Sequence, residues 1–171
     1  AGIDAGEYAA PFFCDIDEDG KAEFFVGNRD GIILSYKNVG TAEPEWQLVE
    51  NYFKDIDVGS RSKLAFYDTD SDGDLDAIVG EYQGNLNLYE NTGTKTAPEF
   101  KLKNEIYADI DVGSRAAPFF CDFNGNGKTT LLIGRGDGKI SLYEKAGAED
   151  VWQKVTDNYN LIDAGETSTI A

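Results

Sequence analysis

Acidic side chains alternate around a glycine in two short stretches of the sequence. Residues 15–23 read Asp-Ile-Asp-Glu-Asp-Gly-Lys-Ala-Glu, and residues 68–76 read Asp-Thr-Asp-Ser-Asp-Gly-Asp-Leu-Asp. Carboxylates at positions 1, 3, 5 and 9 could surround a hard cation with oxygen, and the glycine at position 6 permits the sharp turn that this wrapping needs. The backbone carbonyl at position 7 can add another oxygen. The predicted ligands are Asp15, Asp17, Asp19, Lys21 and Glu23 in the first loop and Asp68, Asp70, Asp72, Asp74 and Asp76 in the second.

Electrostatic repulsion favours a bound cation in these loops over a solvated acidic turn without metal. Two like charges 4 Å apart repel by about 1 kcal/mol in water and about 4 kcal/mol near a protein surface. Calcium tolerates flexible all-oxygen coordination better than magnesium, so we expect two calcium sites with dissociation constants of roughly 10⁻⁴–10⁻³ M. An EF-hand is excluded, because it requires glutamate at position 12, where Val26 and Val79 stand.

A third loop at residues 122–130 is a weaker version of the same pattern. It reads Asp-Phe-Asn-Gly-Asn-Gly-Lys-Thr-Thr, so asparagine carbonyls can replace the carboxylates at positions 3 and 5, whereas Thr130 replaces the acid at position 9. Its candidate ligands are Asp122, Asn124, Asn126 and the backbone carbonyl of Lys128. With one formal anion, this loop is expected to bind calcium weakly or not at all.

The loops recur because the whole chain is internally repeated. The tag Ile-Asp-x-Gly begins at residues 3, 56, 110 and 162, and residues 10–15 and 117–122 are both Ala-Pro-Phe-Phe-Cys-Asp. Self-similarity at a fixed period of this size is typical of repeat architectures. We therefore expect a single domain over residues 1–171, made of repeats 3–55, 56–109 and 110–161 and a partial repeat 162–171.

Each repeat contains the pattern of four short strands. In the second copy these are residues 64–67, 77–80, 85–89 and 99–102, separated by glycine-containing turns, and the continuous apolar run at 64–67 predicts an inner strand buried on both faces. Tandem four-stranded units predict an all-β fold of β-propeller blades. Three antiparallel blades and the first strand of a fourth form a partial ring, to be completed by a homo-oligomer or by further repeats in a longer array.

Composition limits the classes of partner and chemistry. The net charge of −17 repels nucleic acid and anionic lipid, and no apolar run is long enough to insert in a membrane. Histidine is absent, which removes the usual general base, and no nucleophile–base pair stands out, so no catalytic residue is predicted. Cys14 and Cys121 occupy the same position in non-adjacent repeats and are expected to be free, buried thiols.

The chain resembles the FG-GAP/VCBS repeat family, whose calcium loop also occurs in integrin alpha-chain propellers. The resemblance is carried by the acidic loops, by the following Phe-Val-Gly (25–27) and Ile-Val-Gly (78–80), and by the Tyr-x-Asn segments at 36–38 and 89–91. The second repeat matches best, and the third departs at Thr130. The resemblance implies a calcium-stabilised propeller, usually extracellular or at the cell surface, used for adhesion or recognition.

Three functions remain open from the sequence. The first is a non-enzymatic, calcium-binding recognition module with a glycan or protein ligand. The second is a structural component that self-assembles through its blades, and the third is a fragment of a polysaccharide-processing enzyme. The turns at 28–30, 81–83 and 135–137 carry arginine and tyrosine and could contact a ligand, although solvated hairpin tips are the simpler interpretation. The recurring aromatics Trp46, Phe100 and Trp152 are expected to pack rather than bind sugar.

Overall fold

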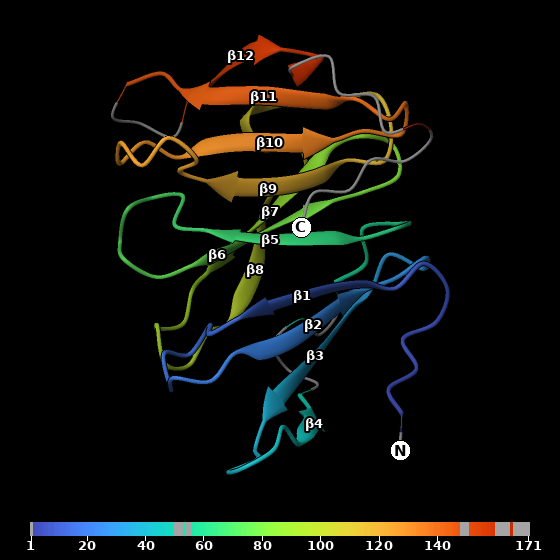
Figure 1. Cartoon of the computed structure of the whole chain (residues 1–171), viewed down its shortest axis with the longest axis vertical. Helices are drawn as coiled ribbons and strands as arrows, with labels where there is room; N and C mark the ends of the chain where they lie inside the picture. Colours follow the sequence, from blue (N-terminus) through green and yellow to red (C-terminus); the bar gives the residue numbers. More distant parts are fainter. Residues whose placement is uncertain (1, 50–52, 54–55, 148–150, 160–164, 166–171) are drawn as a thin grey trace.

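The computed structural model describes residues 2–49, 53, 56–147, 151–159 and 165, and it contains three four-stranded antiparallel sheets (Figure 1). Blade 1 consists of β1 (Ala10–Cys14), β2 (Glu23–Gly27), β3 (Ile33–Asn38) and β4 (Trp46–Leu48). Blade 2 consists of β5 (Lys63–Tyr67), β6 (Asp76–Gly80), β7 (Leu86–Asn91) and β8 (Phe100–Asn104). Blade 3 consists of β9 (Ala117–Cys121), β10 (Thr130–Gly134), β11 (Ile140–Lys145) and β12 (Trp152–Thr156). The all-β architecture of propeller blades is confirmed.

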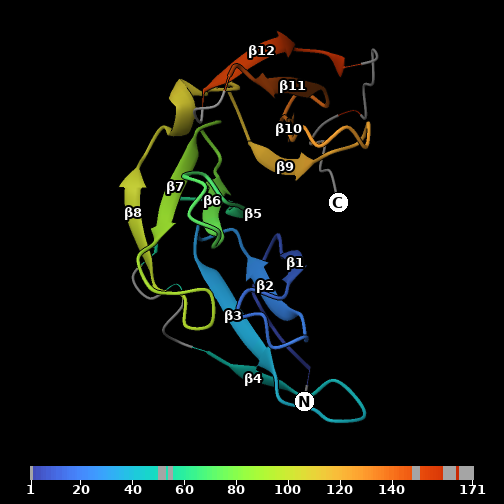
Figure 2. The same cartoon turned by 90° about the vertical axis from the view of Figure 1, so that its left-hand side faces the viewer.

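The blades fan out as an arc rather than a closed ring. In Figure 2 the first strands β1, β5 and β9 line the concave side, and the last strands β4, β8 and β12 lie at the outside. Residues of all three first strands border a groove of about 440 Å³ on the concave side. Blades 1 and 3 therefore form the two ends of the arc, and each presents one flank that no other blade among the described residues covers.

The second strand of a blade, rather than the first, is the most buried. All five residues of β6 are buried, whereas Phe66 and Tyr67 of β5 remain partly exposed. The expectation that residues 64–67 are buried on both faces was therefore wrong for half of that strand. The physical reason is strand position: β5 is an edge strand of its sheet and Tyr67 borders a hollow beside the third loop, while β6 has a hydrogen-bonded strand on either side.

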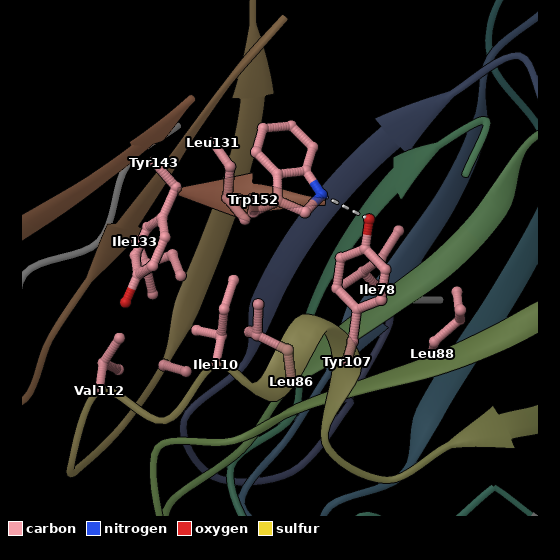
Figure 3. Close-up of a cluster of buried hydrophobic side chains, with 11 residues drawn as sticks. Ile78, Leu86, Leu88, Tyr107, Ile110, Val112, Leu131, Ile133, Tyr143 and Trp152 are labelled. Carbon is pink, nitrogen blue, oxygen red and sulfur yellow. Dashed lines mark hydrogen bonds between the residues drawn. The ribbon is translucent and has the colours of Figure 1, made fainter. Parts of the chain in front are cut away.

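Hydrophobic side chains fill the spaces between consecutive blades. Between blades 2 and 3, Ile78 and Leu86 from one sheet pack with Leu131 and Ile133 from the other (Figure 3). The short 3-10 helix η1 (Tyr107–Asp109) contributes to the same cluster, and the Tyr107 hydroxyl accepts a hydrogen bond of 2.9 Å from the Trp152 indole Nε1. A second cluster fills the space between blades 1 and 2 and includes Phe25, Phe53 and Phe100. Packing between sheets is what holds the arc together.

The Ile-Asp-x-Gly tags join each blade to the next through the backbone. Val112 N–H donates to the Gly84 carbonyl over 3.0 Å, and Val58 N–H donates to the Gly31 carbonyl over 3.1 Å. Both glycines have a positive φ, and a Cβ on Gly84 would stand 2.6 Å from the Gly113 nitrogen. Asp111 shapes this turn by accepting a hydrogen bond from Gly113 N–H.

Three further expectations concern particular segments. Cys14 and Cys121 are free, although both are half-buried rather than fully buried. The partial repeat 162–171 lies, except for Gly165, outside the described residues, so its expected strand stays a prediction. Within the ranges described, no helix has the length and apolarity to cross a membrane.

Candidate metal-binding loops

The three acidic loops share one backbone scaffold. Each connects the first and second strands of its blade, so all three lie at the same end of the sheets. In every loop the aspartate at position 1 accepts a hydrogen bond from the glycine N–H at position 6: Asp15 from Gly20 (3.0 Å), Asp68 from Gly73 (3.1 Å) and Asp122 from Gly127 (2.6 Å). The first aspartate thus fixes the turn by the local hydrogen bonding that aspartate side chains commonly make in loops.

The first loop gathers its three leading aspartates around a lysine. One carboxylate oxygen from each of Asp15, Asp17 and Asp19 lies within 4.8 Å of the other two. The ammonium group of Lys37, from the neighbouring strand β3, forms ion pairs with Asp17 and, over 3.1 Å, with Asp19. The hydrogen bond from Lys37 lowers the pKa of Asp19, and the bond to Asp17 raises the pKa of Lys37. Lys37 therefore neutralises part of the loop charge.

Two buried carboxylate oxygens of the first loop have no hydrogen-bond partner in the described part of the chain. Asp17 and Glu23 are buried, with 6% and 0% of their surface exposed. Glu23 Oε2 accepts a hydrogen bond from Ile16 N–H, but Asp17 Oδ1 and Glu23 Oε1 accept none from the described residues. Burial raises the pKa of Glu23, with smaller contributions from Asp17 and Asp19. A buried oxygen without a partner costs free energy, and a cation is one way to satisfy it.

The second loop carries more net negative charge than the first, and less of that charge is balanced by a nearby lysine. Asp68, Asp70 and Asp72 also bring one oxygen each within 4.8 Å of one another. Lys103 lies 3.9 Å from Asp70 but makes its closer ion pair with Glu90. Desolvation, and then repulsion from Asp72 and Asp76, raises the pKa of Asp70 and of Asp74. Like charges gathered without a counter-ion have this effect, and a divalent cation would reverse it.

The carboxylate at position 9 closes the loop in addition to offering oxygen. Asp76 is buried, and its Oδ2 accepts hydrogen bonds from the backbone and side chain of Thr69, while Oδ1 accepts one of 2.8 Å from Asn91 N–H. Glu23 makes the corresponding bond to Ile16 in blade 1. The third loop has Thr130 at this position, so it lacks this anionic anchor.

The third loop adopts the shared turn with fewer anions. Asn126 Oδ1 accepts a hydrogen bond from Lys128 N–H over 2.9 Å, as Asp19 does from Lys21 N–H. Asp122 is exposed, and no acidic cluster forms here among the described residues. Asn124, Asn126, Gly127 and Lys128 instead border a polar hollow of about 500 Å³. The backbone is therefore similar in all three loops, whereas the charge is not.

The donor set of the first two loops suits a hard divalent cation. Both offer several carboxylate oxygens on a preformed turn, without sulfur or imidazole. The family model of the FG-GAP-like repeat matches residues 68–133, which run from the second acidic loop to β10. This segment is similar to an FG-GAP-like repeat. No curated protein gives a significant match to the chain.

The matched segment includes both the loop with the most net negative charge and the loop with the least. The match begins at Asp68 and extends just beyond Thr130, so it spans the second acidic loop, strands β6 to β9 and the third loop. Residues 15–23 lie outside the matched segment but repeat its acidic spacing, and blade 1 has the same strand order as blade 2. FG-GAP-like repeats often bind calcium, which agrees with the oxygen-rich chemistry of the loops.

A row of alternating tyrosine and arginine lies at the opposite end of the blades from the loops. The Arg61 guanidinium is 4.2 Å from the ring centre of Tyr8 and 5.3 Å from that of Tyr82, and the Arg115 guanidinium is 5.7 Å from Tyr82. These cation–π contacts join the tags of blades 1 to 3. Tyr8 and Tyr82 keep 58% and 45% of their surface exposed, so the row is open to a ligand.

Sequence reasoning found only one member of this Tyr–Arg row. Tyr82 was singled out in the turn at 81–83, but Tyr8, Arg61 and Arg115 were not. Their position in the sequence could have indicated them, because each of these three residues lies five residues after the isoleucine of its tag. All three also have a positive φ, which turns the backbone in the same way at every blade.

Proposed function

We propose that the protein is a calcium-stabilised, non-enzymatic recognition module that works outside the cell or at its surface. The single observation that carries the calcium part is the pair of buried carboxylate oxygens of Asp17 and Glu23 that accept no hydrogen bond from the described residues. FG-GAP-like repeats are generally non-enzymatic and typically extracellular, which supports the rest of the assignment. Asp15, Asp17 and Asp19 would hold one ion, and Asp68, Asp70 and Asp72 another.

Calcium should raise the melting temperature of the protein. A ligand that binds only the folded state at a hundred times its dissociation constant adds about 2.7 kcal/mol per site. For two sites in a domain of this size, the expected increase is on the order of 10 °C relative to the protein in EDTA. Calorimetry with calcium, magnesium and EDTA measures it. An unchanged melt would contradict the calcium proposal.

A charge-removing variant locates the stabilising ion. Asp70→Asn keeps the size of the side chain but removes one anion from the second loop, so it should lose much of the calcium-dependent increase. Asp137→Asn is the matched control, because Asp137 lies in the turn after β10, at the end of the sheet away from the loops. Equal calcium responses of the two variants would argue against a site at residues 68–76.

We further propose that the Tyr–Arg row is the recognition surface for a glycan or protein ligand. Exposed aromatic rings offer flat apolar contact, and the guanidinium groups between them can donate paired hydrogen bonds to carboxylates or hydroxyls. In a glycan array and a panel of extracellular proteins, the wild type should bind a ligand that Tyr82→Ser loses. Leu102→Ser is a control of comparable exposure on β8. Binding that survives Tyr82→Ser would place the ligand elsewhere.

A further inference from the structure

The exposed flank of blade 1 carries aromatic side chains, and at three of their four repeat positions blades 2 and 3 bury the equivalent residues. Phe13, Phe24, Tyr36 and Trp46 form a connected aromatic patch, with the rings of Phe13 and Phe24 stacked at 4.7 Å and those of Phe24 and Trp46 5.5 Å apart. We call these four residues the blade 1 patch. Phe13 is 56% exposed, and the other three are partly exposed. The patch is apolar surface that another element can cover.

The equivalent positions within the arc show what covers such a patch. By strand pairing, Trp46 corresponds to Phe100 of blade 2 and Trp152 of blade 3, and both of these keep only 8% of their surface exposed. Tyr36 corresponds to Tyr89 and Tyr143, which are 5% and 4% exposed. In blades 2 and 3 the covering side chains come from the preceding blade and its linker. The blade 1 patch therefore has the form of a blade interface that no described residue of a preceding blade covers.

The flank of blade 3 shows the complementary half of the same interface. Phe123 is 46% exposed, whereas Ile16 and Thr69, at the same repeat position, are 4% and 6% exposed, and Ile16 packs in the cluster between blades 1 and 2. Leu132 is half-buried, while its equivalents Phe25 and Ile78 are fully buried. Blade 3 thus exposes the type of surface that, in blades 1 and 2, packs against the following blade.

The aromatic residue in the linker after each blade shows which two side chains would meet across the open flanks. Phe53 stacks on Phe100 with ring centres 4.8 Å apart, and Tyr107 accepts the hydrogen bond of Trp152. The residue at this position after blade 3 is Tyr159, which is only partly buried and contacts Phe123. Tyr159 on the flank of blade 3 and Trp46 on the flank of blade 1 are therefore equivalent to Tyr107 and Trp152, which are hydrogen-bonded between blades 2 and 3.

We propose that two copies of this chain join head to tail, with blade 3 of each on blade 1 of the other, in a closed six-bladed ring. The internal interfaces already use these register positions, so the contact continues an established one. Propellers have about four to eight blades, and copies of three blades can meet that range only with six. Tyr159 of one copy would then accept a hydrogen bond from Trp46 of the other, and both open flanks would be covered.

Molecular mass in solution tests the ring directly. Light scattering after size exclusion should give a dimer for the 171-residue chain, and dilution should shift tryptophan fluorescence to longer wavelength. This shift reports Trp46, because Trp152 is already buried within the chain. A monomer at every concentration would overturn the proposal and would assign the flanks to another partner or to further repeats. Open-ended polymers would also overturn it, because the ring would not close.

Paired variants test the head-to-tail arrangement. Phe13→Asp and Tyr159→Asp should each raise the dimer dissociation constant at least about tenfold, since either change places a charge in both interfaces. Leu102→Asp, a control with 50% exposure on the middle blade, should leave it unchanged. Circular dichroism confirms that each variant folds. Mixing Phe13→Asp with Tyr159→Asp should restore dimers, because one of the two interfaces is then wild type on both sides. Failure of the mixture to associate, or a Tyr159→Asp variant that dimerises normally, would refute this arrangement.

Discussion

Lys37 makes the first acidic loop different in kind from the second. Its ammonium group pairs with Asp17 and Asp19 from an adjacent strand, so part of the negative charge is balanced by the protein itself. In the second loop, Glu90 holds the nearby Lys103, and the pKa values of Asp70 and Asp74 are raised by desolvation and mutual repulsion. Without metal, the second loop is therefore under more electrostatic stress. The gain from a divalent cation should accordingly be larger there.

Replacing Lys37 should strengthen calcium binding at the first loop. The variant Lys37→Met keeps the length of the side chain but removes the competing positive charge, so we expect calcium affinity at this loop to rise about three- to tenfold. Titration calorimetry measures the change. Lys101→Met is the control, because Lys101 pairs with Glu99 on an exposed surface. Equal or weaker binding by Lys37→Met would show that the lysine supports the site rather than competes for it.

The effect of Asp70→Asn on stability should change sign with calcium and should depend on pH. Because the folded state raises the pKa of Asp70, folding binds a proton more tightly there, and this aspartate destabilises the metal-free fold as pH rises through that pKa. In EDTA at neutral pH the variant should be more stable than the wild type. That advantage should shrink as the pH falls towards about 4, the ordinary range of an aspartate.

With saturating calcium at neutral pH, the order should reverse, because the wild type gains the binding energy that Asp70→Asn loses. Urea unfolding at several pH values, with and without calcium, measures all of these differences. A variant that is less stable than the wild type under every condition would mean that Asp70 acts through its hydrogen bonds alone.

At the level of elements, the tags and turns set the spacing between blades. Gly84 and Gly113 approach each other across the junction of blades 2 and 3, and Gly31 and Gly59 do the same between blades 1 and 2. The backbone hydrogen bonds across these junctions hold one end of the arc, and the hydrophobic clusters hold the middle. The Tyr–Arg row is attached to these same tags, so junction geometry also fixes the spacing of the proposed recognition surface.

A methyl group at Gly84 should separate blades 2 and 3. Gly84→Ala combines a φ of +105° with a Cβ only 2.6 Å from a backbone nitrogen, so we expect a loss of about 2 to 4 kcal/mol in the free energy of unfolding. Gly113→Ala is the matched control: its φ is +87° but no heavy atom lies within 4 Å, so it should lose only about 1 kcal/mol. Chemical denaturation measures both. Equal losses would show that conformational strain, not close approach, matters at this junction.

At the scale of the whole molecule, charge and apolar surface act against each other. The chain has a net charge of −17, so two copies repel, while the aromatic flank of blade 1 and the apolar flank of blade 3 favour contact. Salt screens repulsion between exposed charges but leaves apolar burial intact. Bound calcium would act in the same direction by lowering the net charge of each copy.

Association of two chains should therefore strengthen with ionic strength. Raising sodium chloride from about 50 mM to about 500 mM shortens the screening length severalfold, and the dimer dissociation constant should fall. Sedimentation equilibrium at several salt concentrations measures this trend. Weaker association at high salt would instead indicate an interface held by ion pairs, which the blade 1 patch does not provide.

The sequence alone determined the parts of this protein that depend on local pattern. Acidic spacing around Gly20 and Gly73 indicated the loops, the Ile-Asp-x-Gly tags marked the repeats, and alternating side chains indicated the strands, because each of these signals lies within a few neighbouring residues. Tertiary structure decided what depends on separate strands meeting. It placed Lys37 against Asp17, stacked Arg61 between two tyrosines and left Trp46 partly exposed while Trp152 was buried. Equivalent residues in the repeats have different surroundings, because the position of a blade in the arc determines what covers it.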